Sequence, residues 1–329
     1  MRSPCSACKF KTDNARVEEL LEKLRQQAPP LSGIFNVNKP AGVTSHDVVQ
    51  AIRKASGVRR VGHAGTLDPM ATGVLLVCVG SATRVTEYLM EHPKRYRAEI
   101  TLGVVTDTLD GEGQVTQVVD ASHVTREMVE RALEMFTGTI QQVPPMYSAL
   151  KRDGKKLYEL AREGITVERE PREVEIRQIE LLAWDPPRVT LDIECSKGTY
   201  IRALARDLGE QLGVGAHLSG LTRTASGRFT VEEASDLDTI IEAIKDGWWM
   251  LLIHPLDEAL LDYQAMIVDR ETEEKIRHGQ MVEAAPPPDG TQGRPLARAY
   301  SHDGRFIAVM RYEEWAGKWQ PDKVFAKAG

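Results

Sequence analysis

The chain has 329 residues, of which 42% are hydrophobic and 27% are charged, enough for one large and one small domain around a sizeable core. The apolar run at residues 74–79 is far shorter than the roughly 20 residues of a membrane helix, and the N-terminus lacks a secretory signal pattern. We therefore expect a cytoplasmic protein that does not cross a membrane. The net charge of −6 disfavours a uniformly basic surface for nucleic acid. Locally, however, residues 53–97 contain eight bases and three acids, and phosphate binding depends on local charge.

Residues 1–32 are expected to form an N-terminal extension outside the folded body. Apolar residues at positions 17, 20, 21 and 24 have helical spacing, and the proline pair ending at Pro30 stops any such helix. Cys5 and Cys8 form a CxxC pair. A zinc site needs two further ligands at matched spacing, and none follows nearby, so we predict no metal site.

In the first part of the body, apolar segments alternate with turn residues. In order, the patterns predict a strand at 34–38, a turn at 39–42, a helix at 45–54, a glycine-rich loop up to Gly73, and strands at 74–79 and 94–100. Ser45 is predicted to cap its helix. The strand at 94–100 alternates between apolar and charged residues, which places Tyr96 on its buried face.

The second part of the body continues this mixture and then changes after Pro255. Before Pro255 we predict, in order, a helix at 125–136, a basic helix or loop at 151–164, a strand at 189–195 and a helix from 201. After Pro255 we predict a strand at 265–268, a helix at 271–277, a loop at 284–295 and short strands at 305–310 and 323–325. Thr199 is the predicted cap of the helix from 201. Because there is no regular βαβ cycle, the pattern favours an α+β fold with a mixed, mostly antiparallel sheet and a small, mainly β C-terminal domain.

Several common catalytic motifs are missing: a GxxxxGK[ST] phosphate loop, an HExxH zinc helix, a GxSxG elbow and a GxGxxG nucleotide loop. What remains is the glycine-rich loop at 61–73, which places His63, Asp68 and two threonines together and allows close approach to a ligand. The Asp68 carboxylate is its only strong nucleophile candidate. Asp before Pro is also a common turn former, and spacing alone favours that structural interpretation.

Five segments in this order resemble the TruB family of tRNA pseudouridine synthases, which modify the T-loop uridine. They are NKPAGVTS at 38–45, GHAGTLDPMATG at 62–73, KRYRA at 94–98, PMYSALK at 145–151 and CSKGTYIR at 195–202. The resemblance implies a catalytic domain over 33–262 with an RNA-contacting insertion at about 144–172. The tail, 263–329, resembles the PUA RNA-binding module.

The resemblance also implies roles for individual residues. Asp68 becomes the catalytic nucleophile that isomerises uridine 55 of tRNA, after the base has flipped out of its stack into the pocket. Substrate-binding positions are implied at His63, Tyr96, Tyr200, Arg202, Leu221 and Lys39. Tyr96 is expected to stack on the uracil, and Arg202 to keep Asp68 ionised, because burial alone would favour the protonated acid. Position 222 is threonine where arginine is commoner in the family, so a phosphate contact there is not expected.

The reaction is redox-neutral and consumes no energy carrier, so neither a cofactor nor a metal is expected. The length and the insertion favour a stand-alone monomer that acts on the T-arm of tRNA without a protein partner. Attack at C1′, attack at C6 and a glycal route all stay open. Three other functions fit part of the sequence: a relative within a guide-RNA particle, a non-catalytic RNA chaperone, and a carboxylate glycosidase if Asp107 or Asp110 approaches Asp68 in space.

Overall fold

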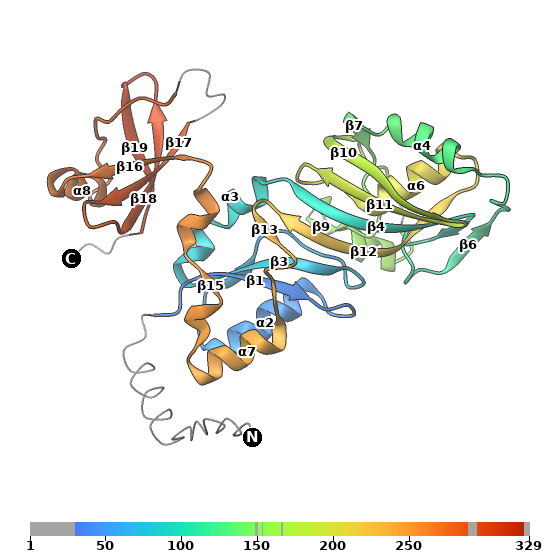
Figure 1. The fold of residues 1–329 in the computed structure, drawn as a ribbon, viewed down its shortest axis with the longest axis horizontal. Helices are drawn as coiled ribbons and strands as arrows, with labels where there is room; N and C mark the ends of the chain where they lie inside the picture. Colours follow the sequence, from blue (N-terminus) through green and yellow to red (C-terminus); the bar gives the residue numbers. More distant parts are fainter. Residues whose placement is uncertain (1–29, 149–150, 153, 166, 289–294, 326–329) are drawn as a thin grey trace, which may run out of the picture.

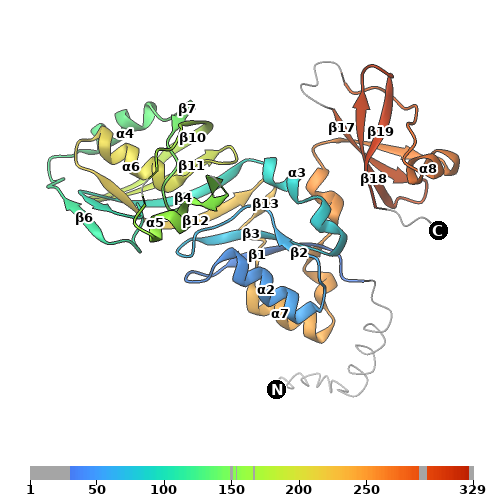
Figure 2. The ribbon, with the colours of Figure 1, turned by 180° about the vertical axis from the view of Figure 1, so that it is seen from behind.

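The computed structural model describes residues 30–148, 151–152, 154–165, 167–288 and 295–325 (Figure 1). They form a large sheet with helices packed against it and a separate small β sheet at the C-terminal end (Figures 1 and 2). This confirms the α+β fold with a mixed, mostly antiparallel main sheet. Among the described residues no helix is long and apolar enough to cross a membrane. The predicted helix at 17–24 and the pair Cys5 and Cys8 lie outside the described residues.

Eleven strands of the described chain make up the main sheet, eight of them side by side in the order β14-β1-β3-β12-β4-β11-β10-β7. Strands β2, β13 and β15 pair with β3, β12 and β1 respectively. The bounds are β1 Gly33–Lys39, β2 Val61–His63, β3 Thr72–Val79, β4 Lys94–Leu102, β7 Gly138–Gln142, β10 Arg172–Asp185, β11 Arg188–Cys195, β12 Ala216–Ser226, β13 Phe229–Thr230, β14 Ser235–Asp236 and β15 Ile253–His254. Two pairs are parallel, β1 with β14 and β3 with β12.

Helices cover this sheet, and two short hairpins project from it (Figures 1 and 2). The α-helices are α2 Ser45–Ser56, α3 Thr86–Glu91, α4 Arg126–Glu134, α5 Leu157–Arg162, α6 Ile201–Gln211, α7 Leu237–Asp246 and α8 Arg270–Arg277, and the 3-10 helices are η1 Gly80–Arg84, η2 Trp249–Leu251 and η3 Leu256–Leu260. The hairpins are β5 Val104–Thr106 with β6 Val115–Val118, and β8 Lys151–Arg152 with β9 Lys155–Lys156.

The two halves of the main sheet differ in how many of their faces are buried. In β3, Leu75 belongs to the core under α2 and α7, while Leu76 belongs to a second core on the opposite face, with α3. In β4 only one face is buried: Tyr96 packs into the first core, and its neighbour Arg97 is exposed. A strand buried on both faces is apolar throughout and a half-buried strand alternates, so the two sequence patterns follow from this difference.

Two predicted helix caps are wrong. Thr44, not Ser45, caps α2: its hydroxyl accepts a hydrogen bond from the Asp47 amide, and the Asp47 carboxylate accepts one from the Thr44 amide. This capping box satisfies two amides at the helix start. Helix α6 begins after Tyr200 without a side-chain cap, because the Thr199 hydroxyl donates instead to the carbonyl of Ser196, at 3.0 Å.

The C-terminal part is a four-stranded sheet in the order β16-β17-β18-β19, with α8 beside it (Figure 1). Its strands are β16 Gln264–Val268, β17 Leu296–Ser301, β18 Phe306–Glu313 and β19 Lys318–Val324. It docks on the main body next to α3: Arg84 donates to the Val324 carbonyl at 2.6 Å, and the Tyr88 hydroxyl donates to Asp322 at 2.9 Å. The guanidinium of Arg84 also lies 4.6 Å from the ring centre of Phe325.

Several elements were missed by the sequence patterns. The longest is β10, where exposed residues are so frequent that no clear alternation survives. Strand β12 carries polar side chains on both faces near the centre of the sheet, and α7 falls in a segment for which no element was predicted. In the basic segment the structure has β8, β9 and α5. The predicted strand at 323–325 begins five residues earlier, at Lys318.

Candidate active site

Asp68 lies in the loop between β2 and β3, and this loop is fixed on both sides of it. The Ser45 hydroxyl accepts a hydrogen bond from the Leu67 amide at 2.8 Å and donates to the Leu67 carbonyl at 3.1 Å. On the other side, Lys39 Nζ donates to the Pro69 carbonyl at 3.1 Å. The first position of α2 and the end of β1 therefore hold the backbone of both neighbours of Asp68.

Lys39 is fully buried beneath this loop. Besides the Pro69 carbonyl, its ammonium group donates to the carbonyls of Pro40 and Val43, at 2.9 and 2.7 Å. Burial lowers the pKa of Lys39 to about 8, and the charge of Asp68 opposes this shift. Because an ammonium group has three N–H donors, the structure places all three on protein carbonyls rather than at the opening of the site.

Asp68 forms a two-point contact with Arg202, in the first turn of α6. Nη2 of Arg202 donates to Oδ1 at 3.1 Å, and Nε lies 2.9 Å from Oδ2. The Arg202 side chain is 6% exposed, whereas that of Asp68 is 34% exposed. The cation is thus enclosed by protein while the carboxylate is open to solvent, which is the arrangement expected of a group that must meet a substrate.

Arg202 also contacts a second carboxylate. Its Nη1 donates to Asp110 at 3.2 Å and to the Thr108 carbonyl at 3.1 Å, and its Nη2 donates to the Tyr147 carbonyl at 2.7 Å. Asp110 is 5% exposed and accepts further hydrogen bonds from the Thr108 hydroxyl and the Glu112 amide. One guanidinium therefore lies between two carboxylates and is fixed by contacts on all three of its nitrogens.

This arrangement sets the acidity of Asp68. Burial raises the pKa of Asp68 above its ordinary value, Arg202 opposes the increase, and the nearby Asp110 charge adds to it. A fixed cation is what allows a crowded carboxylate to stay ionised. The close approach of Asp110, considered above for a paired-acid glycosidase, does not provide a free second acid, because three donors occupy this carboxylate.

Arg223 is a further buried cation, on β12 behind the loop. It is 1% exposed, and it donates to the carbonyls of Val74 and Gly65 at 2.6 and 3.2 Å. Its backbone pairs with Gly73 of β3. A Cβ atom at Gly73 would lie 2.3 Å from the Arg223 carbonyl oxygen, and φ there is +92°, so only glycine fits.

Two of the other predicted pocket residues, Tyr96 and Tyr200, lie near Asp68 on different elements. Tyr96 is buried on β4, and Tyr200 is half-buried just before α6. The pKa of both hydroxyls is raised, mainly by burial and to a lesser extent by the charge of Asp68. Leu221 is half-buried on β12 in register with Ala98 of β4.

His63 ends β2 and is half-buried; burial and the charge of Arg223 lower its pKa, which keeps the ring neutral near pH 7. The Thr222 hydroxyl lies 2.9 Å from that of Thr72, so position 222 forms part of the β3–β12 contact.

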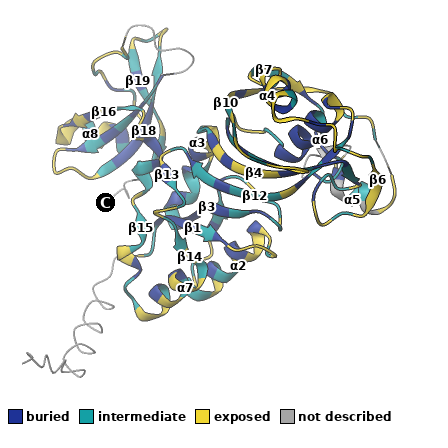
Figure 3. Ribbon diagram, turned by 45° about the vertical axis from the view of Figure 1, so that its right-hand side comes forward, coloured by how far each residue is buried: buried dark blue, intermediate teal, exposed yellow. Residues whose placement is uncertain are grey.

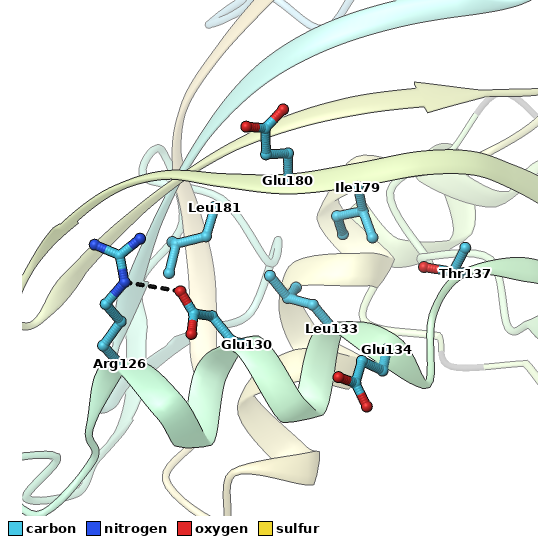
Figure 4. A pocket seen from close by; sticks show the side chains of 8 residues that line it. All are labelled: Arg126, Glu130, Leu133, Glu134, Thr137, Ile179, Glu180 and Leu181. Atoms are coloured by element: carbon cyan, nitrogen blue, oxygen red, sulfur yellow. Dashed lines mark hydrogen bonds and ion pairs between the residues drawn. The ribbon is translucent and has the colours of Figure 1, made fainter.

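A separate hollow lies between α4 and β10, away from Asp68 (Figure 4). It is lined by Arg126, Glu130, Leu133, Glu134, Thr137, Ile179, Glu180 and Leu181. Arg126 and Glu130 form an ion pair of 2.7 Å across its edge. Within the described part of the chain no group of three His, Cys, Asp or Glu residues is arranged to hold a metal ion.

Three buried polar residues of the site were not identified by sequence reasoning. Asp110 was noted only as a possible second acid, and Arg223 and Gln142 were not assigned any part. Each stands in a strand or turn whose pattern gives no sign that its polar side chain faces inward. The pairing of β12 with β3 and β4 brings Arg223 to the site, and the pairing of β7 with β10 places Gln142 beside it.

Comparisons with known families and proteins identify the family of this chain. The model of the TruB family pseudouridylate synthase N-terminal domain matches residues 53–201, and that of the tRNA pseudouridylate synthase B C-terminal domain matches residues 202–261. The tRNA pseudouridine synthase B of Symbiobacterium thermophilum is 51% identical over 257 residues, covering 77% of this chain and 84% of that protein. The protein of the same name from Dehalococcoides mccartyi (strain BAV1) is 43% identical over 297 residues, covering 90% and 97%.

Solved structures show the same fold. A chain of a Cbf5-Nop10-Gar1 complex superposes with a TM-score of 0.71 and 27% identity, covering 93% of this chain and 87% of that chain. A chain of an H/ACA RNP bound to a substrate RNA containing 2′-deoxyuridine superposes with a TM-score of 0.69 and 24% identity, with the same coverage. The chain therefore belongs to the TruB family of pseudouridylate synthases and is a tRNA pseudouridine synthase.

Proposed function

We propose that this enzyme isomerises uridine 55 in the T-loop of tRNA, with Asp68 as its nucleophile and the target base flipped into the pocket. The observation that carries the proposal is the contact of Asp68 with Arg202, in which an enclosed guanidinium holds a partly exposed carboxylate. A carboxylate kept ionised in this way is suited to covalent attack or to stabilising a cationic sugar. The choice of uridine 55 rests on the resemblance to the family.

The residues around Asp68 suit a flipped pyrimidine. Tyr96 offers an aromatic ring for stacking, Leu221 an apolar wall, and Tyr200 a second ring at the start of α6. His63 is neutral and half-buried, so it can take the space left by the base in the RNA without bringing a charge into it. Stacking of this kind offsets part of the few kcal/mol that base extrusion costs.

We further propose that residues 33–262 are the catalytic domain, that the insertion at about 144–172 contacts RNA, and that 263–329 is a PUA-like RNA-binding domain. The enzyme is proposed to act as a cytoplasmic monomer on the T-arm, without a protein partner. Support for the division comes from the two separate sheets, of which the smaller begins at Gln264. In this scheme Lys39 serves substrate binding indirectly, since its donors hold the Asp68 loop.

The test is incubation with an unmodified tRNA transcript, followed by mapping of pseudouridine at single-nucleotide resolution. We expect one new pseudouridine, at position 55, and none in a transcript with cytidine there. Asp68→Asn should abolish product while tRNA binding, measured by filter retention, is kept. Product at another uridine would refute the proposed position, and normal product with Asp68→Asn would refute the nucleophile.

A further inference from the structure

A buried amide side chain lies directly behind the active-site helix. Gln142 ends β7 and is 1% exposed. Its Nε2 donates to the Tyr200 carbonyl at 3.1 Å, and its Oε1 accepts a hydrogen bond from the Tyr200 amide at 2.8 Å. One side chain thus satisfies both backbone groups of a single residue, as a neighbouring strand would do.

Tyr200, the clamped residue, lies at the start of the active-site helix. It is extended, with φ −99° and ψ 109°, and it immediately precedes α6 without a side-chain cap. Two residues later comes Arg202, whose guanidinium contacts Asp68. A rotation of the backbone at Tyr200 would therefore move a pocket ring and the cation partner of Asp68 together.

Gln142 also stands at the base of the segment that resembles the RNA-contacting insertion. Its Cα partner across the sheet is Arg172 of β10, so the chain leaves the sheet at Gln142 and returns to it at Arg172. Just beyond Gln142, the carbonyl of Tyr147 accepts a hydrogen bond from Arg202 at 2.7 Å. The start of this segment is consequently tied to α6 at two places.

We propose that Gln142 is a positioning residue for the isomerisation: its amide fixes the Tyr200 backbone and, through it, the Arg202 guanidinium on Asp68. This rests on the function proposed above. The hydrogen bonds of the Gln142 side chain go to the Tyr200 backbone and not to Asp68, and the side chain is buried, so its effect is on turnover of bound RNA rather than on RNA affinity. Small displacements of a catalytic group cost up to about 100-fold in rate, and we expect a loss of roughly 10- to 100-fold.

The test compares Gln142→Met with Gln141→Met in the full chain. Methionine has nearly the shape of glutamine but neither donates to nor accepts from Tyr200, and Gln141 is the exposed neighbour on the same strand. With tRNA transcript as the probe, single-turnover rates at saturating enzyme and Kd are measured separately. We expect the rate of Gln142→Met to fall as stated with Kd within about twofold, and Gln141→Met to match the wild type.

Amide hydrogen exchange supplies a second measurement in case the first variant loses stability. Peptides covering residues 197–204 should exchange faster in Gln142→Met, and also in the conservative Gln142→Asn, which keeps the amide but is one methylene too short to reach both backbone groups of Tyr200. Equal rates for Gln142→Met and Gln141→Met, a loss confined to Kd, or unchanged exchange in both Gln142 variants would overturn the proposal. An inactive wild-type enzyme would instead refute the function proposed above.

Discussion

Replacing Arg202 by lysine tests whether the geometry of the cation or only its charge supports Asp68. In the native site the guanidinium makes five N···O contacts of 2.7–3.2 Å, to Asp68, Asp110 and the carbonyls of Thr108 and Tyr147. An ammonium group has three donors on one atom and cannot form a planar two-point contact with a carboxylate. At least two of the five acceptor contacts must therefore be lost.

The size of the effect follows from those lost contacts. A hydrogen bond to a charged group contributes about 1.5–3 kcal/mol, and part of the loss falls on Asp110 and the carbonyls rather than on Asp68. A barrier increase of about 2–4 kcal/mol corresponds to a rate about 30- to 1000-fold lower. Affinity for tRNA should change little, because the Arg202 side chain is 6% exposed and contacts protein groups.

The assay is single-turnover formation of pseudouridine in a tRNA transcript with the enzyme in excess, together with a separate Kd. Arg177→Lys is a matched control, since Arg177 is 47% exposed on β10 and pairs with Glu175 on the surface. We expect its rate and Kd to equal those of the wild type. Equal losses of rate and affinity in Arg202→Lys, or a rate within threefold of the wild type, would show that the two-point contact is not what supports Asp68.

Three further predictions concern the same site. The turnover rate should fall as the pH decreases through a pKa that lies above the ordinary value for aspartate, because burial raises the pKa of Asp68 and the protonated acid is not nucleophilic. A turnover rate that does not change down to pH 4 would contradict this prediction. Asp110→Asn removes a negative charge that raises the pKa of Asp68, so the acid limb of the pH–rate profile should move to lower pH. An acid limb that stays in place would show that the Asp110 charge does not affect the pKa of Asp68. Lys39→Met leaves the Pro69 carbonyl and two other carbonyls without a donor, and a buried group left without a hydrogen bond destabilises the fold by about 1–3 kcal/mol. Thermal unfolding should therefore occur several degrees lower, and turnover should slow. An unchanged Tm would argue against the anchoring role of Lys39.

Local sequence patterns predicted the elements whose environment is uniform along their length. Residues 74–79 are apolar because both faces of β3 are buried, and 94–100 alternate because β4 has one exposed face. The sequence patterns failed where the environment changes along an element. Strand β10 runs from the packed part of the sheet to a mostly exposed end, and its side chains follow no single period.

The polar residues of the site show a different limit. Asp110 and Gln142 are buried because partners 92 and 58 residues away in sequence meet them. A buried polar group is tolerated only when it is hydrogen-bonded, and the residue that provides the bond is set by tertiary pairing rather than by neighbouring sequence. The contact between Arg202 and Asp68 was predicted from the resemblance to a family, because several motifs in a fixed order carry information that the spacing of residues does not.

Asp68, which precedes a proline, is both a turn former and a residue with a free carboxylate, so the structural and the functional interpretations of this pair are compatible. Its carbonyl accepts a hydrogen bond from the Ala71 amide at 3.1 Å, which is the turn that spacing favours. The turn uses only backbone groups, so the carboxylate stays free to contact Arg202. Because Lys39 and Ser45 hold the residues on each side, the turn presents this carboxylate in one orientation. The feature that made Asp68 look structural is therefore the one that fixes its carboxylate, and in the proposed role of nucleophile a group on a rigid turn loses little entropy when the substrate binds.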